Sequence, residues 1–374
     1  MRKSKLAVSV HIKLVLALAS LLFSGSAIAE GEQPRELAND SPPNGLVVVI
    51  ENKPDRPLNL RALDNPFISG VALQIHWADI EPTEGNPDWT KLDRLFAAAE
   101  SSKKWVHLLI FPGFFSPPWA LEGVKTELFA LQYGPGKGTV ERLPIPWNRV
   151  YLDRWFAFLK QLSDRYGKSP AFRLLAADGP TSVSAEFTLP KRPVDLKKWQ
   201  QDSYRPSKYI GAWKEVFQVY ADDFPNQFIS LSAGSGQINI NEQGKLDARQ
   251  PLQTRKAIVD EADAILGRRF VLQMSDVHAG PGPHSVDSEK EEKFVIGFNG
   301  RIVTGFQLRT SAERNSGVMG AEGDPPQALK KSINLALEPN EAGKHVNYLE
   351  IYEPDVLADD MQAELRHAAS VFGP

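Results

Sequence analysis

Two glutamates, Glu186 and Glu350, are the strongest candidates for chemistry in this chain of 374 residues. Paired carboxyl groups can hydrolyse a glycosidic bond, because one protonates the leaving oxygen while the other attacks or stabilises the anomeric carbon. Glu350 lies in the apolar run at 346–352. Side chains alternate along a strand, and Leu349 and Ile351 suit packing against outer helices, so we expect Glu350 to point inward. The alternative is a structural carboxylate bonded to a neighbouring Arg or Tyr.

Several aromatic and polar residues that could bind a sugar follow the apolar runs of the sequence. Sugar rings have apolar faces that stack on aromatic side chains, and their hydroxyl groups bond to carboxylates, amides and imidazoles. The predicted substrate-binding residues are His76, Trp77, Trp119, Asp178, Asp276, Gln307 and Tyr352. For His76, Trp77 and Trp119 the alternative is a place in the core. Glu81 is expected to brace the loop before Pro82.

These residues must be positioned by apolar runs that alternate with amphipathic stretches. The runs predict strands at 46–50, 71–77, 105–111, 172–177, 228–231, 270–274, 302–306 and 346–352, each followed by a helical segment. Eight such pairs are typical of a closed (β/α)8 barrel, whose active site lies at the carboxyl ends of the strands. A doubly wound open sheet shares the alternation. The barrel is favoured because no Gly-x-Gly-x-x-Gly turn follows the first strand.

The beginning of the chain has the pattern of a secretory signal peptide. Basic residues at 2–5 precede an apolar stretch at 14–23 and the small-residue sequence Ala27-Ile28-Ala29, which predicts cleavage after Ala29. A membrane anchor is the alternative, but its apolar stretch would need roughly 20 residues. We therefore predict an exported protein, periplasmic or extracellular, with a signal peptide at 1–29, a flexible segment at 30–43 and a single barrel domain at 44–374.

Composition excludes several classes of function. The chain has 43 basic and 46 acidic residues and no long basic run, so neither nucleic acid nor, after signal cleavage, a membrane is an expected partner. It has no cysteine, which excludes disulfides, thiol catalysis and thiolate metal sites. Asp276, His278 and His284 could suggest a metal site, but without a third nearby histidine a solvated loop is favoured. We predict a carbohydrate substrate, no metal and no cofactor.

One part of the sequence resembles a known family. The stretch at 77–85, with Asp88-Trp89 and Leu92-Asp93, resembles the second strand and helix of clan A glycoside hydrolases, particularly the β-galactosidase-like branch. The resemblance extends to Ser116-Pro117-Pro118-Trp119 after the third strand. It implies a retaining hydrolase with a carboxylic acid after the fourth strand and a carboxylate nucleophile after the seventh.

The sequence departs from that family at both catalytic positions. Clan A enzymes usually place Asn-Glu directly after the fourth strand, whereas here Glu186 follows a longer passage that starts at Gly179. The seventh strand ends in Gly305-Phe306-Gln307, where the family pattern requires Glu, and Glu350 is the candidate substitute. Two hypotheses follow: an exported glycosidase that uses Glu186 and Glu350, or a barrel that binds carbohydrate without cleaving it. Gln307 supports the second.

Overall fold

The structure, a computed structural model, describes residues 41–132, 137–180, 187–233, 237–281 and 293–372. The predicted signal peptide and most of the segment at 30–43 lie outside these ranges. Glu186 and His284 also lie outside them.

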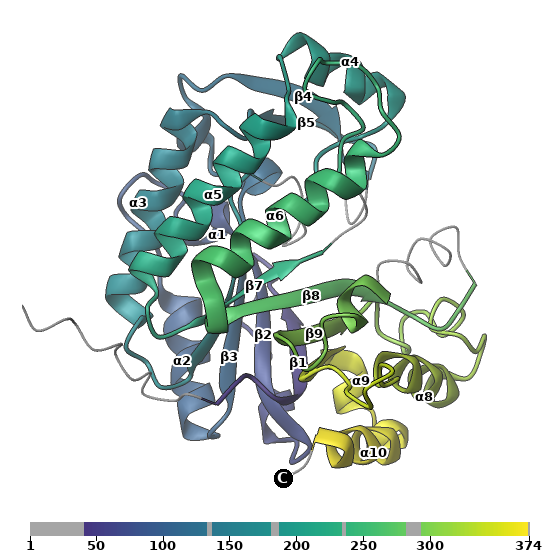
Figure 1. Cartoon of the computed structure of the whole chain (residues 1–374). Helices are drawn as coiled ribbons and strands as arrows, with labels where there is room; N and C mark the ends of the chain where they lie inside the picture. Colours follow the sequence, from purple (N-terminus) through teal and green to yellow (C-terminus); the bar gives the residue numbers. More distant parts are fainter. Residues whose placement is uncertain (1–40, 133–136, 181–186, 234–236, 282–292, 373–374) are drawn as a thin grey trace, which may run out of the picture. The chain divides into compact units, whose positions relative to one another are not determined.

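Parallel strands close a barrel in which the first strand pairs with the last (Figure 1). The eight strands are β1 (Gly45–Glu51), β2 (Ile68–His76), β3 (Trp105–Phe111), β6 (Phe172–Ala176), β7 (Phe228–Ser232), β8 (Phe270–Val277), β9 (Val303–Leu308) and β10 (Tyr348–Tyr352). Their order around the barrel is β1-β10-β9-β8-β7-β6-β3-β2. The predicted (β/α)8 barrel is confirmed, because an open sheet would leave β1 and β10 unpaired.

Amphipathic helices surround the barrel. They are α2 (Thr90–Ser101), α3 (Arg149–Tyr166), α5 (Pro206–Asp223), α6 (Gln250–Leu266), α8 (Pro325–Ala336) and α10 (Gln362–Phe372), with the shorter α1 (Trp77–Ile80), α4 (Pro193–Gln201) and α9 (Glu353–Leu357). Local sequence fixes several of their starts. The Asn148 side chain accepts a hydrogen bond from Tyr151 N at the start of α3, and proline occupies the first turn of α5, α6 and α8. No helix in the described ranges is long and apolar enough to cross a membrane.

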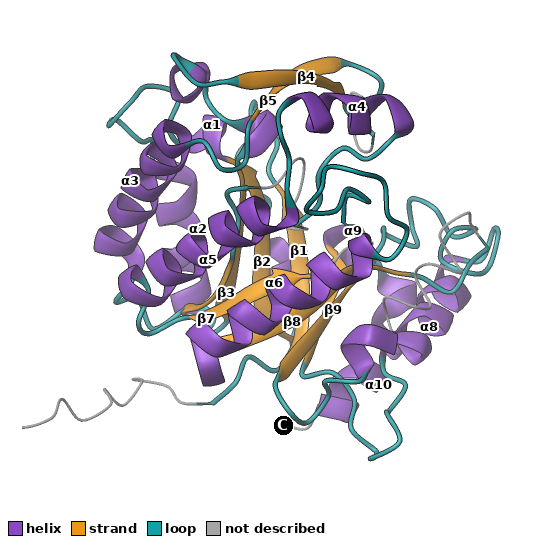
Figure 2. Cartoon of the chain, turned by 45° about the horizontal axis from the view of Figure 1, so that its top comes forward, coloured by secondary structure: helices purple, strands orange, loops and turns teal. Residues whose placement is uncertain are grey.

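An antiparallel hairpin stands outside the barrel. β4 (Thr126–Ala130) pairs with β5 (Val140–Pro144) in the long connection between β3 and α3. Both strands are short and carry charged side chains, so they lack the apolar runs that revealed the barrel strands. Figures 1 and 2 show the hairpin next to α4, which belongs to the connection after β6. Both connections leave strands at their carboxyl ends.

Aromatic rings fill the barrel at the amino-terminal ends of its strands. Trp105, Phe228 and Tyr348 are the first residues of β3, β7 and β10. The rings of Trp105 and Tyr348 meet edge to face with their centroids 5.9 Å apart. Glycines make room for them, because a Cβ on Gly305 would lie 2.1 Å from Tyr348 Cζ and one on Gly70 would lie 2.6 Å from the Trp105 ring. These two positions therefore exclude any side chain.

Gly305→Ala should destabilise the protein. The added methyl group would overlap the Tyr348 ring, which is 0% exposed and packs edge to face against Trp105. Overpacking of this kind costs on the order of 1–3 kcal/mol or more of unfolding free energy, which urea denaturation measures. Gly211→Ala is the matched control, since nothing lies within 4 Å of a Cβ there and alanine favours α5. Equal urea midpoints for Gly305→Ala and the wild type would contradict the packing of Tyr348 over β9.

Candidate functional site

The carboxylate of Glu350 lies inside the barrel, on the carboxyl-end side of the aromatic layer formed by Trp105, Phe228 and Tyr348. Its side chain is 0% exposed, and both oxygens are hydrogen-bonded. Oε1 is 2.6 Å from His107 Nδ1 of β3. Oε2 accepts hydrogen bonds from Gln273 Nε2 of β8 at 3.0 Å and from Gln307 Nε2 of β9 at 2.7 Å. The structure thus places Glu350 inward, as predicted, and surrounds it with donors from three other strands.

The side-chain amides of Gln273 and Gln307 each accept a hydrogen bond at the oxygen and donate one to Glu350 from the nitrogen. The Tyr348 hydroxyl donates to Gln273 Oε1 at 2.7 Å, so the Gln273 amide nitrogen is turned toward Glu350. Gln74 Nε2 donates to Gln307 Oε1 at 3.3 Å, which orients the second amide in the same way. Each amide therefore accepts on one side and donates to the buried charge on the other.

His107 completes the network on the opposite side of the carboxylate. Its ring is fully buried, and Nε2 lies 3.0 Å from Ser230 Oγ of β7. The amides of Gln273 and Gln307 both donate to Glu350, so the carboxyl group is the acceptor of the network, and His107 Nδ1 is the donor that faces its Oε1. Burial and the nearby charge of Glu350 raise the pKa of Tyr348 well above its usual value, which keeps its hydroxyl as a donor.

Two predicted site residues, Gln307 and Tyr352, join this interior. Gln307 is buried inside β9, because the strand runs on to Leu308 instead of ending at 306 as predicted. Tyr352 is the last residue of β10 and is also buried. Burial, followed by the charges of Glu51 and Glu350, raises the pKa of Tyr352, so the phenol is neutral. The two residues lie where the interior meets the carboxyl-end opening of the barrel, here called the mouth.

His76 lies at the mouth as the last residue of β2. Its ring stacks on Phe115 with centroids 3.8 Å apart and an interplanar angle of 1°. Nδ1 is 3.7 Å from Asp79 Oδ2, and the side chain remains 40% exposed. Burial lowers the pKa of His76, and the charge of Asp79 opposes that shift only in part. His76 is thus a neutral, accessible imidazole near pH 7, able to donate and to accept.

The structure places Trp77 in the core. β2 ends at His76, so Trp77 begins α1 and turns beneath α3, where its ring meets that of Trp155 edge-on at 5.1 Å. Its Nε1 donates to Glu81 Oε2 at 2.9 Å, and it is 0% exposed. In this arrangement Trp77 offers no face to a sugar, which corrects the expectation of a direct contact. The half-buried Trp119 also packs against Trp77 and donates to the backbone oxygen of Glu81.

The brace predicted at Glu81 is confirmed. Its buried carboxylate accepts hydrogen bonds from Trp77 Nε1 and from Gly85 N, the latter at 2.9 Å, and so closes the loop at 81–85. Gln161 of α3 adds a third donor at 3.3 Å. Burial nevertheless raises the pKa of Glu81 above its usual value. In the stretch at 77–85, which resembles clan A enzymes, Trp77 and Glu81 therefore have structural roles: they hold the connection between β2 and α2 in place.

Asp178 and Asp276 lie at different strand ends. Asp178 follows β6 and is buried, and its backbone N–H donates to the Tyr220 hydroxyl at 3.0 Å. Asp276 lies near the end of β8, half-buried, with Oδ1 3.4 Å from Arg309 Nε. Within the described ranges, no three His, Asp or Glu side chains are arranged to hold a metal ion.

Glu186 belongs to the segment 181–186, outside the described residues. The residues on either side are held by one tyrosine. The Tyr209 hydroxyl lies 3.0 Å from the backbone oxygen of Pro180 and 3.2 Å from that of Phe187. Tyr209 therefore holds Pro180 and Phe187, the described residues on either side of this segment, at a single buried point.

Besides Tyr348, the sequence interpretation missed four members of the network: Gln74, His107, Ser230 and Gln273. All four are polar residues at inward positions of strands that begin with apolar residues or consist mostly of them. Burying a polar group is unfavourable unless it is hydrogen-bonded, so a lone polar residue in such a strand indicates a partner across the barrel. That signal was available in the sequence.

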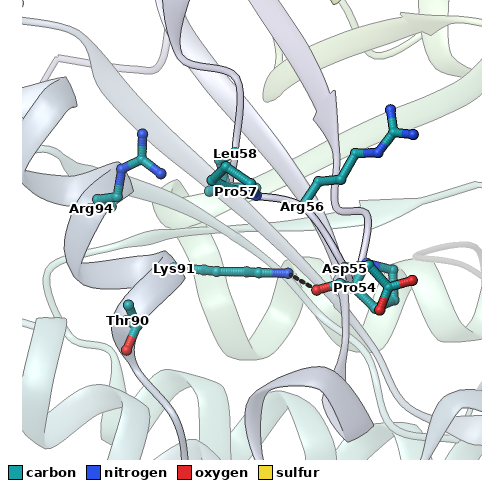
Figure 3. Close-up of a pocket in the computed structure, with 8 residues that line it drawn as sticks. All are labelled: Pro54, Asp55, Arg56, Pro57, Leu58, Thr90, Lys91 and Arg94. Atoms are coloured by element: carbon teal, nitrogen blue, oxygen red, sulfur yellow. Dashed lines mark hydrogen bonds between the residues drawn. The ribbon is translucent and has the colours of Figure 1, made fainter.

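A cavity of about 310 Å³ lies at the outer rim, between residues 54–58 after β1 and the start of α2 (Figure 3). Lys91 Nζ donates to the backbone oxygens of Lys53 and Pro54, both at 3.0 Å, and to Asn52 Oδ1 at 2.8 Å. Lys91 thus ties the loop after β1 to α2. None of the predicted site residues lines this cavity.

Comparisons with known proteins support the fold. No family model matches the chain, and no curated protein matches its sequence. Among solved structures it is similar to the catalytic domain of β-amylase from Paenibacillus polymyxa, with a TM-score of 0.55 and 9% identity over 89% of this chain and 100% of that one. The chain is a (β/α)8 barrel. Xylanase 10B from Thermotoga petrophila, solved with xylobiose, matches at a TM-score of 0.46 and 10% identity over 83% of this chain and 82% of that one. At 9% identity, the similarity to the β-amylase domain speaks for the barrel fold alone.

Gln307→Glu should make stability depend more steeply on pH. The new carboxylate would take the place of an amide nitrogen 2.7 Å from Glu350 Oε2, and two carboxyl groups so close cannot both ionise. The folded variant then retains a proton that unfolded glutamate releases above about pH 4.3. Relative to the wild type, the variant should lose up to roughly 1.4 kcal/mol of stability per pH unit above that value.

Urea unfolding at pH 5 and pH 7 measures this effect, with Gln253→Glu on the exposed face of α6 as the matched control. The control should unfold like the wild type at both values. Equal destabilisation of Gln307→Glu at pH 5 and pH 7 would show that Gln307 does not face a buried charge.

Proposed function

We propose that the chain hydrolyses O-glycosidic bonds of an oligo- or polysaccharide, with Glu186 as the general acid and Glu350 as the second carboxyl group. One observation carries this proposal. Gln307 stands where the family resemblance implies a nucleophile, and its amide nitrogen is 2.7 Å from Glu350 Oε2. The neighbouring strand β10 therefore supplies a carboxylate beside the position where β9 lacks one.

The contacts around Glu350 suit this role. Hydrogen bonds from His107, Gln273 and Gln307 hold both oxygens in fixed positions, so the charge is oriented before a substrate arrives. Glu186 would protonate the glycosidic oxygen, and Glu350 would attack the anomeric carbon to form a glycosyl-enzyme. Water then completes hydrolysis, with Glu186 acting as the base. This scheme uses carboxylates alone and needs no cofactor.

A second candidate is a barrel that binds carbohydrate without cleaving it. A nucleophile must touch the anomeric carbon, whereas Glu350 is 0% exposed and all its hydrogen-bond donors are protein groups. Such a carboxylate serves equally well to fix the floor of a binding site. In either case the signal-like sequence before Glu30 supports export of the protein, to the periplasm or the medium.

Trapping the glycosyl-enzyme tests the first candidate on the wild-type protein. Activated 2-deoxy-2-fluoro glycosides of galactose, glucose and xylose carry a good leaving group, while the fluorine slows attack on the intermediate by destabilising its oxocarbenium-like transition state. We expect mass spectrometry to detect the addition of one fluorosugar, on the peptide that contains Glu350. Glu186→Gln should still form this adduct, because a good leaving group needs little protonation, yet hydrolyse unactivated substrates roughly a hundredfold more slowly.

The outcomes separate the two candidates. An adduct on another residue, or hydrolysis with inversion, would overturn the assignment of Glu350 as nucleophile. Saccharide binding with neither adduct nor hydrolysis would establish the binding barrel instead. A protein that neither binds nor cleaves any saccharide would overturn both.

A further inference from the structure

A solvent-accessible ion pair lies at the mouth and belongs to neither the interior network nor the predicted site. Glu51 is the last residue of β1, and its Cα partner on β2 is Gln74. Arg314 Nη1 donates to Glu51 Oε2 at 2.6 Å, and the two side chains are 43% and 40% exposed, respectively. Glu51 follows the inward-facing Val47 and Val49 at the spacing of two that keeps side chains on one face. The ion pair therefore stands over the barrel interior.

Arg314 is held in place by a buried carboxylate. The connection after β9 folds over Asp355, which is 0% exposed. Asp355 accepts hydrogen bonds from Ser311 Oγ at 2.7 Å, Ala312 N at 2.9 Å and Glu313 N at 3.0 Å. The residue that follows these three donors is Arg314. The guanidinium therefore extends from an anchored turn, and its position over β1 does not depend on a free loop.

The inward surface next to this ion pair is polar, and through Gln74 it is joined to the hydrogen bonds around Glu350. Gln74 Nε2 donates to Gln307 Oε1 at 3.3 Å, which joins this part of β2 to the network around Glu350. Val49, two residues before Glu51 on the same face of β1, is the Cα partner of Tyr352 on β10, so Glu51 lies just beyond that phenol toward the mouth. Two residues beyond Gln74 on the same face of β2, His76 adds its accessible imidazole, backed by Phe115. Glu51 and His76 thus lie at the ends of neighbouring strands on the inward side of the barrel, and Arg314 is paired with Glu51.

The chemistry of the pair selects a class of ligand. A sugar hydroxyl both donates and accepts, so adjacent hydroxyls match a carboxylate beside a guanidinium. Arg314 occupies Oε2 of Glu51, and the exposed part of the carboxylate can still accept. An anionic ligand would have to compete with Glu51 for the guanidinium, because the two charges compensate each other at 2.6 Å. The arrangement favours an uncharged ring.

We propose that Glu51, Arg314 and His76 form a subsite that binds a neutral sugar unit through two adjacent hydroxyl groups. This subsite rests on the proposed function and names its substrate class. Glu51 accepts from one hydroxyl, Arg314 donates to its neighbour, and His76 bonds to a third polar group of the same ring. Acidic sugars are excluded by the compensated charge.

Calorimetric titration with lactose, cellobiose, maltose and xylobiose, and with digalacturonate as the acidic probe, tests the proposal. We expect the wild type to bind at least one neutral disaccharide and to bind digalacturonate more weakly. Glu51→Gln should weaken the neutral ligand about tenfold to a hundredfold, the range for a lost charge-assisted hydrogen bond. It should also bind digalacturonate more tightly than the wild type does, because it removes the carboxylate that is paired with Arg314. Arg314→Gln should weaken the neutral ligand without the gain for digalacturonate.

Glu215→Gln is the matched control, since Arg149 Nη1 donates to Glu215 Oε2 at the same 2.6 Å on the exposed surface of α3 and α5. It should bind every probe like the wild type. Unchanged affinity of Glu51→Gln for the neutral ligand would overturn the subsite while the proposed function stands. If the wild type bound digalacturonate more tightly than the neutral disaccharides, the assignment of a neutral sugar to this subsite would be wrong. No binding of any saccharide by the wild type would overturn both the subsite and the proposed function.

Discussion

The buried carboxylate of Glu350 is the constraint on which the barrel interior depends. A charge inside a protein is strongly unfavourable unless donors surround it. Here Gln273, Gln307 and His107 all turn a nitrogen toward Glu350. Each amide must then accept on its other side, which explains why Tyr348 and Gln74 face the amide oxygens. The direction of every hydrogen bond follows from one negative charge, so an amide at position 350 would place donor against donor.

This charge sits between two layers of different character. Below it, Trp105 and Tyr348 fill the barrel, and Gly70 and Gly305 allow their close approach. Above it, the strands end in polar side chains that are partly exposed, including Glu51. The aromatic layer packs beneath the buried carboxylate, and the partly exposed side chains of the mouth lie above it. From the amino to the carboxyl ends of the strands, the interior thus passes from an aromatic layer to a hydrogen-bonded carboxylate and then to partly exposed polar side chains. This order fits a barrel whose active site lies at the carboxyl ends of its strands.

The sequence was sufficient for the fold but not for the site. Apolar runs located the strands, and the predicted strand at 105–111 has the bounds of β3. Errors of one or two residues in the predicted strand ends mattered for function. β2 ends at His76, so Trp77 turns into the core, and β9 continues to Leu308, so Gln307 lies within the strand and is buried. The contact of His107 with Glu350 joins residues 243 positions apart. Strand tilt and register around the closed barrel decide such contacts, and local spacing does not encode them.

The hydrogen between His107 and Glu350 offers the most direct test of the buried charge. The chain has seven histidines, and selective ¹⁵N labelling lets NMR observe their imidazole N–H groups, with His107→Gln assigning the signal. We predict a far-downfield Nδ1 proton that exchanges slowly with water, because both groups are fully buried at a separation of 2.6 Å. Glu350→Gln should abolish that resonance. A wild-type spectrum in which every imidazole proton exchanges rapidly with water would contradict the account.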